Sequence, residues 1–399
     1  MHTRYLASSI LSLFLVTSPL PAQGEWPTRG WPSTKPLEVG LDAKVLASFD
    51  ADIGEGKYGY IDSMLVIRHG KIAYERFYGH DYGSVYGLES RTPGPLVVHD
   101  PTGPYNYFNP WWHPYYRKGE LHTMQSVTKS VVSAVIGIAV GRQEFPALDT
   151  PVLSFFEPGK VANVDDRKRR MTIRHLLTMS TGLDWDEDVP YADPTNTFTI
   201  MARSPDWVQY TIDRPMARNP GEVFQYNSGA TLVLGHIFRL ATGEDLEEYA
   251  AKYLFSPLGI GDYFWKRTPS GLVDTQEGLY VAPRDIAKIV YLYLKRGQWD
   301  GQQVVPEEWV KASVAPSISV MDDRSIEYGY KWWLYHYQDM GEDRVAFAGT
   351  GFGNQRPIVL PEYDLVLVFT GWNILPGRAY LRVQDAIERV LEAVKDREP

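Results

Sequence analysis

The chain has 399 residues, of which 44% are hydrophobic and 22% are charged, and its formal net charge is −9. This length and composition support a globular protein with one large or two smaller domains, and they exclude wholesale disorder, a collagen and a coiled coil. The negative charge gives no general attraction to nucleic acid, and the absence of cysteine excludes disulfides, thiolate zinc sites, iron–sulfur clusters and a cysteine nucleophile.

The first 24 residues have the pattern of a secretory signal. Arg4 supplies a positive start, residues 6–16 form an apolar run, and two prolines then precede small residues. The run is too short to span a bilayer. A buried N-terminal helix is the alternative, although proline and glycine follow closely. We therefore expect an exported protein, periplasmic or extracellular, that is cleaved after Ala22 or Gly24 and has no stable membrane insertion afterwards.

Strand patterns occur near both ends of the chain, and helical patterns lie between them. Residues 63–78 predict a hairpin that turns at Gly70. Near the C-terminus the predicted elements are short strands at 344–347, 356–360 and 365–370 and a helix over 379–394. We expect an α/β (α+β) fold in which one antiparallel sheet is built from both termini. The expected sheet domain comprises residues 25–122 and 272–399, and a mainly helical domain, 123–271, is inserted.

Residues 92–119 form a segment that is rich in proline and aromatic residues. Its six prolines disfavour regular structure. The aromatic residues are Tyr105, Tyr107, Phe108, Trp111, Trp112, Tyr115 and Tyr116. The segment is either a surface loop held by aromatic packing or one wall of a substrate pocket. For the second case we name Trp111 and Trp112 as candidate substrate-binding residues.

Residues 126–140 predict a buried helix that carries a polar stripe. Ser126, Lys129, Ser130 and Ser133 follow the i, i+3, i+4, i+7 spacing of one helical face. A buried lysine is costly unless it is paired or neutral. A desolvated amine one turn from a serine can accept the hydroxyl proton and activate the oxygen as a nucleophile. The alternative is a capping serine beside a lysine whose amine reaches solvent.

The stretch around this serine resembles the nucleophile helix of serine β-lactamases and penicillin-binding-type hydrolases, with their S-x-x-K pair at Ser126 and Lys129. Further resemblances cover most of the chain, among them LVIRHGKIAYERFYG, TIRHLLTMSTGLDWDED and NPGEVFQYNSGATLVLGHIFRLATG. The resemblance implies a β-lactamase/transpeptidase-like fold. It is strongest to the class C-like branch, which includes esterases, D-amino-acid peptidases and 6-aminohexanoate-dimer hydrolases.

The family's second motif, Y-x-N, resembles residues 226–228 but departs from the family pattern at its last position. Tyr226 is kept, whereas Ser228 stands where asparagine is expected. The resemblance implies that Tyr226 relays a proton to the leaving group and that Ser228 contacts substrate with a shorter reach. A buried tyrosine with a satisfied hydroxyl is the alternative.

The third motif corresponds to Gly349, Thr350 and Gly351, which the resemblance places beside the substrate. It also implies an oxyanion hole formed by the backbone N–H groups of Ser126 and Phe352. Glycine at 349 replaces the basic residue that binds a substrate carboxylate in the family. This departure argues against β-lactam and D-alanyl substrates, unless Arg356 or Lys331 takes over that contact.

No pattern for a metal or cofactor emerges. Nucleotide-binding and H-E-x-x-H motifs are absent from the sequence, and the nine histidines lack ligand spacing. We therefore expect no metal and no cofactor. The acidic residues between 184 and 188 predict a solvated loop, with the alternative that one of them meets a substrate amine.

These patterns together predict an exported serine hydrolase that cleaves a small-molecule ester or amide through a Ser126 acyl-enzyme. Lys129 acts as the base and Tyr226 as the proton relay. The motif departures favour an esterase or a 6-aminohexanoate-oligomer-type amidase. The alternatives are a β-lactamase or D-alanyl peptidase that acts on cell-wall peptides, and a catalytically idle binding or envelope module. No nucleic-acid partner is expected, and the oligomeric state is left open.

Overall fold

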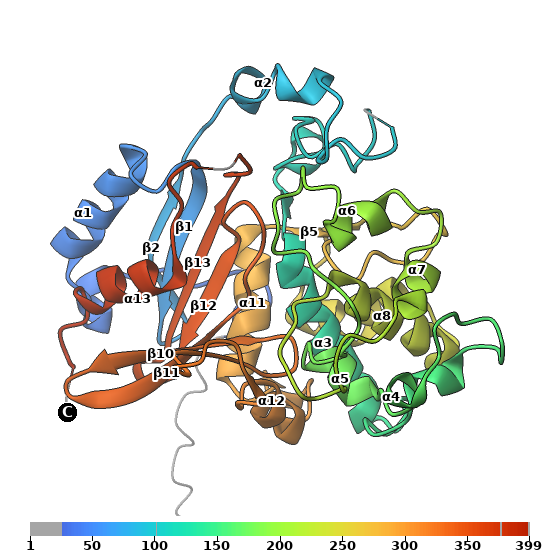
Figure 1. The fold of residues 1–399 in the computed structure, drawn as a ribbon. Helices are drawn as coiled ribbons and strands as arrows, with labels where there is room; N and C mark the ends of the chain where they lie inside the picture. The colour runs from blue at the N-terminus through green and yellow to red at the C-terminus, as the bar shows by residue number, and fades with distance from the viewer. Residues whose placement is uncertain (1–25, 101, 376, 398–399) are drawn as a thin grey trace, which may run out of the picture.

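The computed structural model describes residues 26–100, 102–375 and 377–397. The predicted signal segment, residues 1–24, lies outside the described residues. The described chain forms an antiparallel sheet with helices on both faces and a mainly helical part beside it (Figure 1). The expectation of a sheet built from both termini is therefore confirmed.

Eight strands of the described residues form one sheet in the spatial order β2-β1-β13-β12-β11-β10-β9-β8. Their bounds are β1 (Ile61–Arg68), β2 (Lys71–Phe77), β8 (Ile318–Ser319), β9 (Ile326–Tyr328), β10 (Trp333–Asp339), β11 (Glu342–Ala348), β12 (Arg356–Leu360) and β13 (Leu365–Gly371). β1 pairs with β13, so the two ends of the chain meet inside the sheet and hold each other in register.

A tight turn joins β1 to β2 at the predicted position. His69 and Gly70 have φ values of 53° and 73°. These left-handed values match the twist of a two-residue hairpin turn, and glycine adopts them at low cost. The strands predicted at 344–347, 356–360 and 365–370 are also confirmed as β11, β12 and β13.

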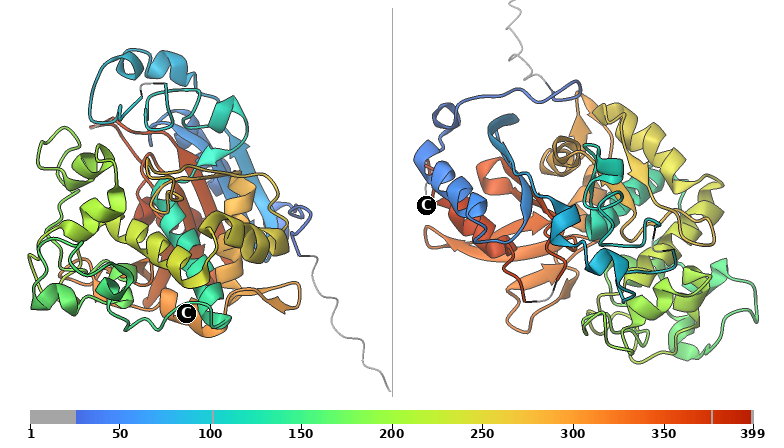
Figure 2. Two further views of the ribbon diagram at one scale, coloured as in Figure 1. Left: turned by 90° about the vertical axis from the view of Figure 1, so that its right-hand side faces the viewer. Right: turned by 90° about the horizontal axis from the view of Figure 1, so that it is seen from above.

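Alternate side chains of the sheet contribute to two separate cores. Met64 of β1 lies in the core that α1 (Ala43–Gly54) and α13 (Val383–Leu391) cover. The next residue, Leu65, lies in the core on the opposite face, where α11 (Pro283–Leu294) packs on the sheet. This alternation is the period of two that a strand buried on both faces requires. The right-hand view of Figure 2 shows the sheet from above, with helices on either side of it.

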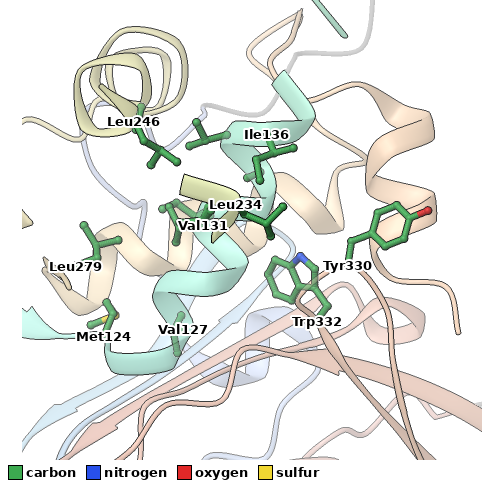
Figure 3. Packing of buried hydrophobic residues seen from close by; sticks show 14 of the residues in the cluster. Met124, Val127, Val131, Ile136, Leu234, Leu246, Leu279, Tyr330 and Trp332 are labelled. Carbon is green, nitrogen blue, oxygen red and sulfur yellow. The ribbon is translucent and has the colours of Figure 1, made fainter. Parts of the chain in front are cut away.

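The mainly helical part is built around α3 (Thr128–Gly141), which is buried over most of its length. Val131 and Ile136 of α3 lie beside Leu234 and Leu246 in one apolar core (Figure 3). The other helices of this part are α4 (Asp166–Arg169), α5 (Ile173–Leu177), α6 (Thr197–Ala202), α7 (Trp207–Asp213), α8 (Ser228–Thr242), α9 (Leu246–Ala250) and α10 (Ser256–Leu258).

A small second sheet fixes the chain just before α3. Its central strand β5 (Leu279–Val281) pairs with β3 (His122–Thr123) and with β4 (Phe264–Trp265). Because β3 leads directly into the turn before α3, this sheet ties the start of α3 to a distant part of the chain. The predicted domain boundaries, near residues 123 and 271, remain predictions.

Further short helices and strands complete these layers. They are α2 (Tyr82–Val85), β6 (Gln298–Trp299), β7 (Gln302–Gln303) and α12 (Glu307–Ser313). Trp309 of α12 and Trp299 of β6 are buried in the core. The segment that contains α2 and residues 92–119 passes over the top of the sheet and the helical part in the view of Figure 1.

Two predicted helices have different bounds in the structure. The helix expected over 126–140 begins as a 3₁₀ turn, Gln125–Val127, and becomes α-helical at Thr128. The helix expected over 379–394 is α13, which ends at Leu391, because Val394 forms a bridge with Leu41 beyond it. Within the described residues, no helix has the length and apolar character needed to cross a membrane.

Gly137 allows α3 and α12 to approach closely, and this contact can be tested. A Cβ at this position would lie 2.2 Å from Trp309 Cδ1, so we expect Gly137→Ala to lower the free energy of unfolding by about 1–3 kcal/mol through overpacking. Gly54→Ala in α1 is the control, because a Cβ there meets no atom within 4 Å. Thermal unfolding measures both variants, and an unchanged Tm for Gly137→Ala would contradict the packing.

Candidate active site

A pocket of about 570 Å³ lies where the start of α3 faces the sheet. Ser126, Tyr226 and Phe352 line it, together with Thr350 and Gly351. Further aromatic residues on its walls are Tyr107, Tyr191, Phe198, Phe224 and Trp333. The structure thus brings the predicted serine, tyrosine and third-motif segment to one concave, largely aromatic site.

The polar centre of the pocket is a contact between Lys129 and Ser126. Lys129 Nζ donates a hydrogen bond to Ser126 Oγ at 2.8 Å and a second to the Gln276 carbonyl at 2.9 Å. The lysine is 1% exposed. Burial lowers the pKa of Lys129 to about 8, while the charges of nearby carboxylates act in the opposite direction. A substantial fraction of this amine is therefore neutral near pH 8 and can accept a proton.

The backbone immediately before Ser126 is strained. Gln125 has a φ of 49°, in the left-handed region that residues with a side chain rarely adopt, and its side chain is buried. Gln125 Nε2 donates to Thr123 Oγ1 at 2.9 Å, which helps to hold this conformation. Strain of this kind persists where the surrounding structure enforces it and is frequent at functional sites. Sequence reasoning missed this feature because glutamine gives no signal for a left-handed conformation.

Tyr226 lies beside the Ser126–Lys129 pair at the end of the loop that precedes α8. Its ring centroid is 5.1 Å from Lys129 Nζ. Burial and the charge of Glu187 raise the pKa of Tyr226 well above its usual value, and the Ser126 hydroxyl only partly offsets this. The phenol is therefore protonated at neutral pH. Asn227 accepts from Ala230 N at 2.9 Å, and this N-cap fixes where the helix after Tyr226 begins.

Ser228 lines the pocket and binds a carboxylate of the protein itself. Its backbone N–H and its hydroxyl donate to Glu187 at 2.9 and 2.8 Å. Trp185 Nε1 donates to the same carboxylate at 2.7 Å. These three donors stabilise the ionised form, whereas burial raises the pKa of Glu187.

The acidic segment is only partly the solvated loop that the sequence predicts. Glu187 and Asp188 line the pocket. Asp184 instead pairs with Arg214 at 2.8 Å, and Asp186 receives a backbone N–H within its own loop. A run of acidic residues does not indicate which member turns inward, so sequence reasoning did not identify Glu187.

The third-motif segment lies close to the start of α3. A Cβ at Gly351 would be 2.5 Å from the Met124 carbonyl oxygen, so only glycine allows this approach. Gly349 packs against Val127 and Pro357 and does not line the pocket, unlike Thr350 and Gly351. A substrate contact at residue 349 stays a prediction.

Trp111 and Trp112 are not among the residues that line this pocket, and their predicted role in substrate binding stays a prediction. Trp111 is 49% exposed. Trp112 packs against Tyr116 and Phe264. The aromatic residue that this segment contributes to the pocket is Tyr107, because packing on Trp372 and His113 turns the preceding part of the segment inward.

Arg356 and Lys331, the two cations that could bind a substrate carboxylate in place of residue 349, lie in different environments. Arg356 lines the pocket, and its Nη1 donates to the Gly351 carbonyl at 2.7 Å. Lys331 is 1% exposed and lies behind the pocket wall. Among the described residues, Lys331 Nζ has one hydrogen-bond contact, to Met179 Sδ at 3.3 Å. Arg356, and not Lys331, can therefore meet a substrate carboxylate.

In the described part of the chain, no group of three or more histidine and acidic side chains is arranged to hold a metal ion. The reactive groups that the pocket offers are thus the hydroxyl, amine, phenol and carboxylates described above.

Burial and repulsion by Lys129 hold the pKa of Lys331 well below its usual value, and this has a measurable consequence. An unfolded lysine keeps its proton up to about pH 10.4. The cost of burying Lys331 is therefore complete below its folded-state pKa, decreases as pH rises above that pKa, and disappears as pH approaches about 10.4. We expect Lys331→Met to raise the free energy of unfolding by roughly 1 kcal/mol or more near pH 7, and by less near pH 10.

Thermal unfolding of the wild type and of Lys331→Met at both pH values measures this difference. Lys71→Met, at an exposed position in β2, is the control and is expected to change stability little at either pH. A variant that is less stable than the wild type at neutral pH would contradict the account of Lys331.

Comparison with known proteins shows the family of this chain. The family model described as Beta-lactamase matches residues 62–371. The 6-aminohexanoate-dimer hydrolase of Paenarthrobacter ureafaciens is 26% identical over 308 residues, which cover 70% of this chain and 76% of that protein. Esterase EstB of Burkholderia gladioli is 28% identical over 244 residues, which cover 58% of this chain and 54% of that protein.

Solved structures show the same fold. The octameric penicillin-binding protein homologue from Pyrococcus abyssi has a TM-score of 0.58 at 20% identity, over 89% of this chain and 78% of that one. A penicillin-binding protein homologue from Caulobacter crescentus has a TM-score of 0.59 at 15% identity, over 87% of this chain and 95% of that one. The β-lactamase/transpeptidase-like fold expected from the sequence is thus confirmed. The family model spans more than half of this chain, and the chain therefore belongs to the β-lactamase family of hydrolases.

Proposed function

We propose that this protein is an exported serine hydrolase that cleaves ester or amide bonds through an acyl-enzyme on Ser126. The observation that carries the proposal is the 2.8 Å contact between Lys129 Nζ and Ser126 Oγ in a site where the amine is removed from water. A serine hydroxyl is a weak nucleophile, and a neutral amine within hydrogen-bond reach is the base that activates it. Export is supported by the composition of the first 24 residues.

In the acylation step, Ser126 Oγ forms a bond to the substrate carbonyl carbon while its proton moves to Lys129 Nζ. Backbone N–H groups of Ser126 and Phe352 stabilise the negative charge that develops on the carbonyl oxygen. The close approach of Gly351 to Met124 supports this arrangement, because it brings the two backbone segments together.

The tetrahedral intermediate then expels the leaving alkoxide or amine. Tyr226, protonated and adjacent to Lys129, passes a proton to the leaving group and is reprotonated from the lysine ammonium. Water attacks the acyl carbon in the second half of the cycle, and the acid and the free serine are released. The same base removes the proton from that water.

The walls of the pocket support a substrate with an apolar or flat acyl or leaving group. Aromatic side chains such as Tyr191, Phe198 and Trp333 line its walls, and Arg356 adds one cation. Similarity to proteins named 6-aminohexanoate-dimer hydrolase and esterase EstB favours an amidase or esterase activity. Because Gly349 has no side chain that could bind a substrate carboxylate, Arg356 is the cation left for that contact. Substrates that carry a carboxylate, nitrocefin and D-alanyl peptides, should therefore be assayed together with esters and amides.

Replacement of Ser126 by alanine tests the nucleophile. We expect Ser126→Ala to reduce turnover of p-nitrophenyl butyrate by at least about 10³-fold, because the covalent step is lost. Ser133→Ala is the matched control, since Ser133 lies in the same helix and outside the pocket. If the folded Ser126→Ala variant turned over p-nitrophenyl butyrate as fast as the wild type, the proposal would be wrong.

The pH dependence of kcat/KM tests the base. Lys129 accepts the serine proton only when it is neutral, and its pKa is lowered to about 8. We therefore expect kcat/KM for p-nitrophenyl butyrate to fall as pH drops through about 8. A profile that stays flat down to about pH 6 would exclude Lys129 as the base and point to a group with a lower pKa.

A further inference from the structure

A cluster of buried charged side chains lies next to Lys129, and one of its members, Glu277, also lines the pocket. The cluster consists of Lys266, Asp274 and Glu277, which are 1%, 0% and 4% exposed. Lys266 Nζ is 3.0 Å from Glu277 Oε1 and 3.9 Å from Asp274 Oδ2. The cluster therefore holds two carboxylates and one ammonium away from water, an arrangement that is costly unless its members satisfy one another.

Two tyrosines from the aromatic segment complete the cluster. The rings of Tyr105 and Tyr107 lie 4.5 and 5.3 Å from Lys266 Nζ. The Tyr105 hydroxyl lies 3.2 Å from Asp274 Oδ2 and 2.9 Å from the Arg267 carbonyl, so its one proton is shared between these two acceptors. Tyr107 donates to Glu277. The cluster is thus satisfied internally, and its formal charge is negative because two carboxylates face one ammonium.

Asp274 connects this cluster to Lys129 through the backbone. Its Oδ1 accepts the N–H groups of Gln276 and Glu277 at 3.2 and 3.3 Å, and its carbonyl accepts the N–H of Gly278 at 3.0 Å. These bonds fix a tight turn. The turn presents the Gln276 carbonyl to Lys129 Nζ at 2.9 Å, opposite the contact to Ser126.

Glycine is required where this turn closes. A Cβ at Gly278 would lie 2.6 Å from the Asp274 carbonyl oxygen and 3.0 Å from Trp265 Cδ1. The turn is also pinned from α8, because Thr275 Oγ1 donates to the Thr231 carbonyl at 2.8 Å. The Gln276 carbonyl therefore has little freedom to move away from the lysine.

We propose that Asp274, together with Glu277 and Lys266, is a positioning residue that orients the Lys129 amine toward Ser126 and stabilises its protonated form. This inference rests on the proposed function, in which Lys129 is the base. Asp274 acts in two separable ways. Its Oδ1 holds the turn, and the net negative charge of the cluster favours the ammonium.

The other groups around Lys129 come from three further segments. Glu187 adds a negative charge from the loop before α6, and Lys331 adds a basic group from the loop before β10. Tyr226 faces Lys129 from the loop before α8 and is protonated. Burial and the charge of Glu277 raise the pKa of Asp274 to about 6, so Asp274 is ionised in the range where Lys129 titrates.

The experiment measures how fast a fluorophosphonate labels Ser126 as a function of pH, followed by intact-protein mass. In this reaction Ser126 Oγ bonds to phosphorus and fluoride leaves, so no knowledge of the substrate is needed. In the wild type we expect the labelling rate to rise with pH to a plateau, and the pH at the midpoint of this rise to be set by the titration of Lys129.

Asp274→Asn keeps the oxygen that caps the turn and removes the charge. We expect it to lower the midpoint by at least about 0.5 pH unit and to keep the plateau rate.

Asp274→Ala removes both charge and cap, so we expect its plateau rate to fall by at least about 10-fold as well. Glu277→Gln repeats the loss of charge, keeps an acceptor for Lys266, and is expected to shift the midpoint in the same direction. Thr275→Val removes an uncharged contact of the same turn and is the matched control. We expect its labelling rate to have the same midpoint pH as the wild type. Thermal unfolding verifies that each variant is folded.

Each outcome distinguishes the inference from the proposed function. If folded Asp274→Asn and Glu277→Gln keep the midpoint of the wild type, the inference is overturned while the proposed function stands. If Thr275→Val shifts the midpoint as far as Asp274→Asn, the effect is structural and the inference also fails. If the wild-type protein is not labelled, or Ser126→Ala is labelled equally, the proposed function itself is wrong.

Discussion

The amine of Lys129 is held out of water between a serine hydroxyl and a backbone carbonyl, and the rest of the site is arranged around that fact. A buried ammonium is costly, so the amine must be neutral for part of the time or be compensated by nearby negative charge. Both occur here. Burial lowers the pKa of Lys129, and carboxylates on neighbouring segments limit the decrease. The outcome is an amine that titrates near pH 8, as the proposed activation of Ser126 requires.

The fold supplies the rigidity that this contact needs. α3 is packed on nearly every side, and the small sheet through β3 and β5 fixes the chain just before Ser126. Gly137 and Gly351 permit close approaches that any larger residue would prevent. Gly137 lets α3 approach α12, and Gly351 lets the third-motif segment approach Met124, just before α3. The strained φ of Gln125 shows that the surrounding packing determines the conformation of the backbone beside Ser126, the proposed nucleophile.

Much of the fold and the centre of the site could be predicted from local patterns. Alternating apolar residues and a turn at Gly70 are sufficient to predict a hairpin. The spacing of Ser126 and Lys129 within an apolar helix is sufficient to predict their contact, because i and i+3 share a helical face. Resemblance to the family motif is sufficient to predict Tyr226, which lies next to that pair.

The features that were missed depend on contacts between distant segments. Glu187 was grouped with its acidic neighbours, and only the folded chain shows that Ser228 and Trp185 bind it. The aromatic segment does contribute to the pocket, but through Tyr107, whereas Trp111 is exposed. The cluster of Lys266, Asp274 and Glu277 has no local signature, since burial and pairing decide its role.

Lys129 and Ser126 define a serine hydrolase only if Ser126 becomes covalently modified. The most direct measurement is peptide mapping by mass spectrometry after the folded protein has reacted with a fluorophosphonate. The account predicts one adduct per chain, located on Ser126. An adduct on a different residue, or a folded protein that remains unmodified, would contradict it.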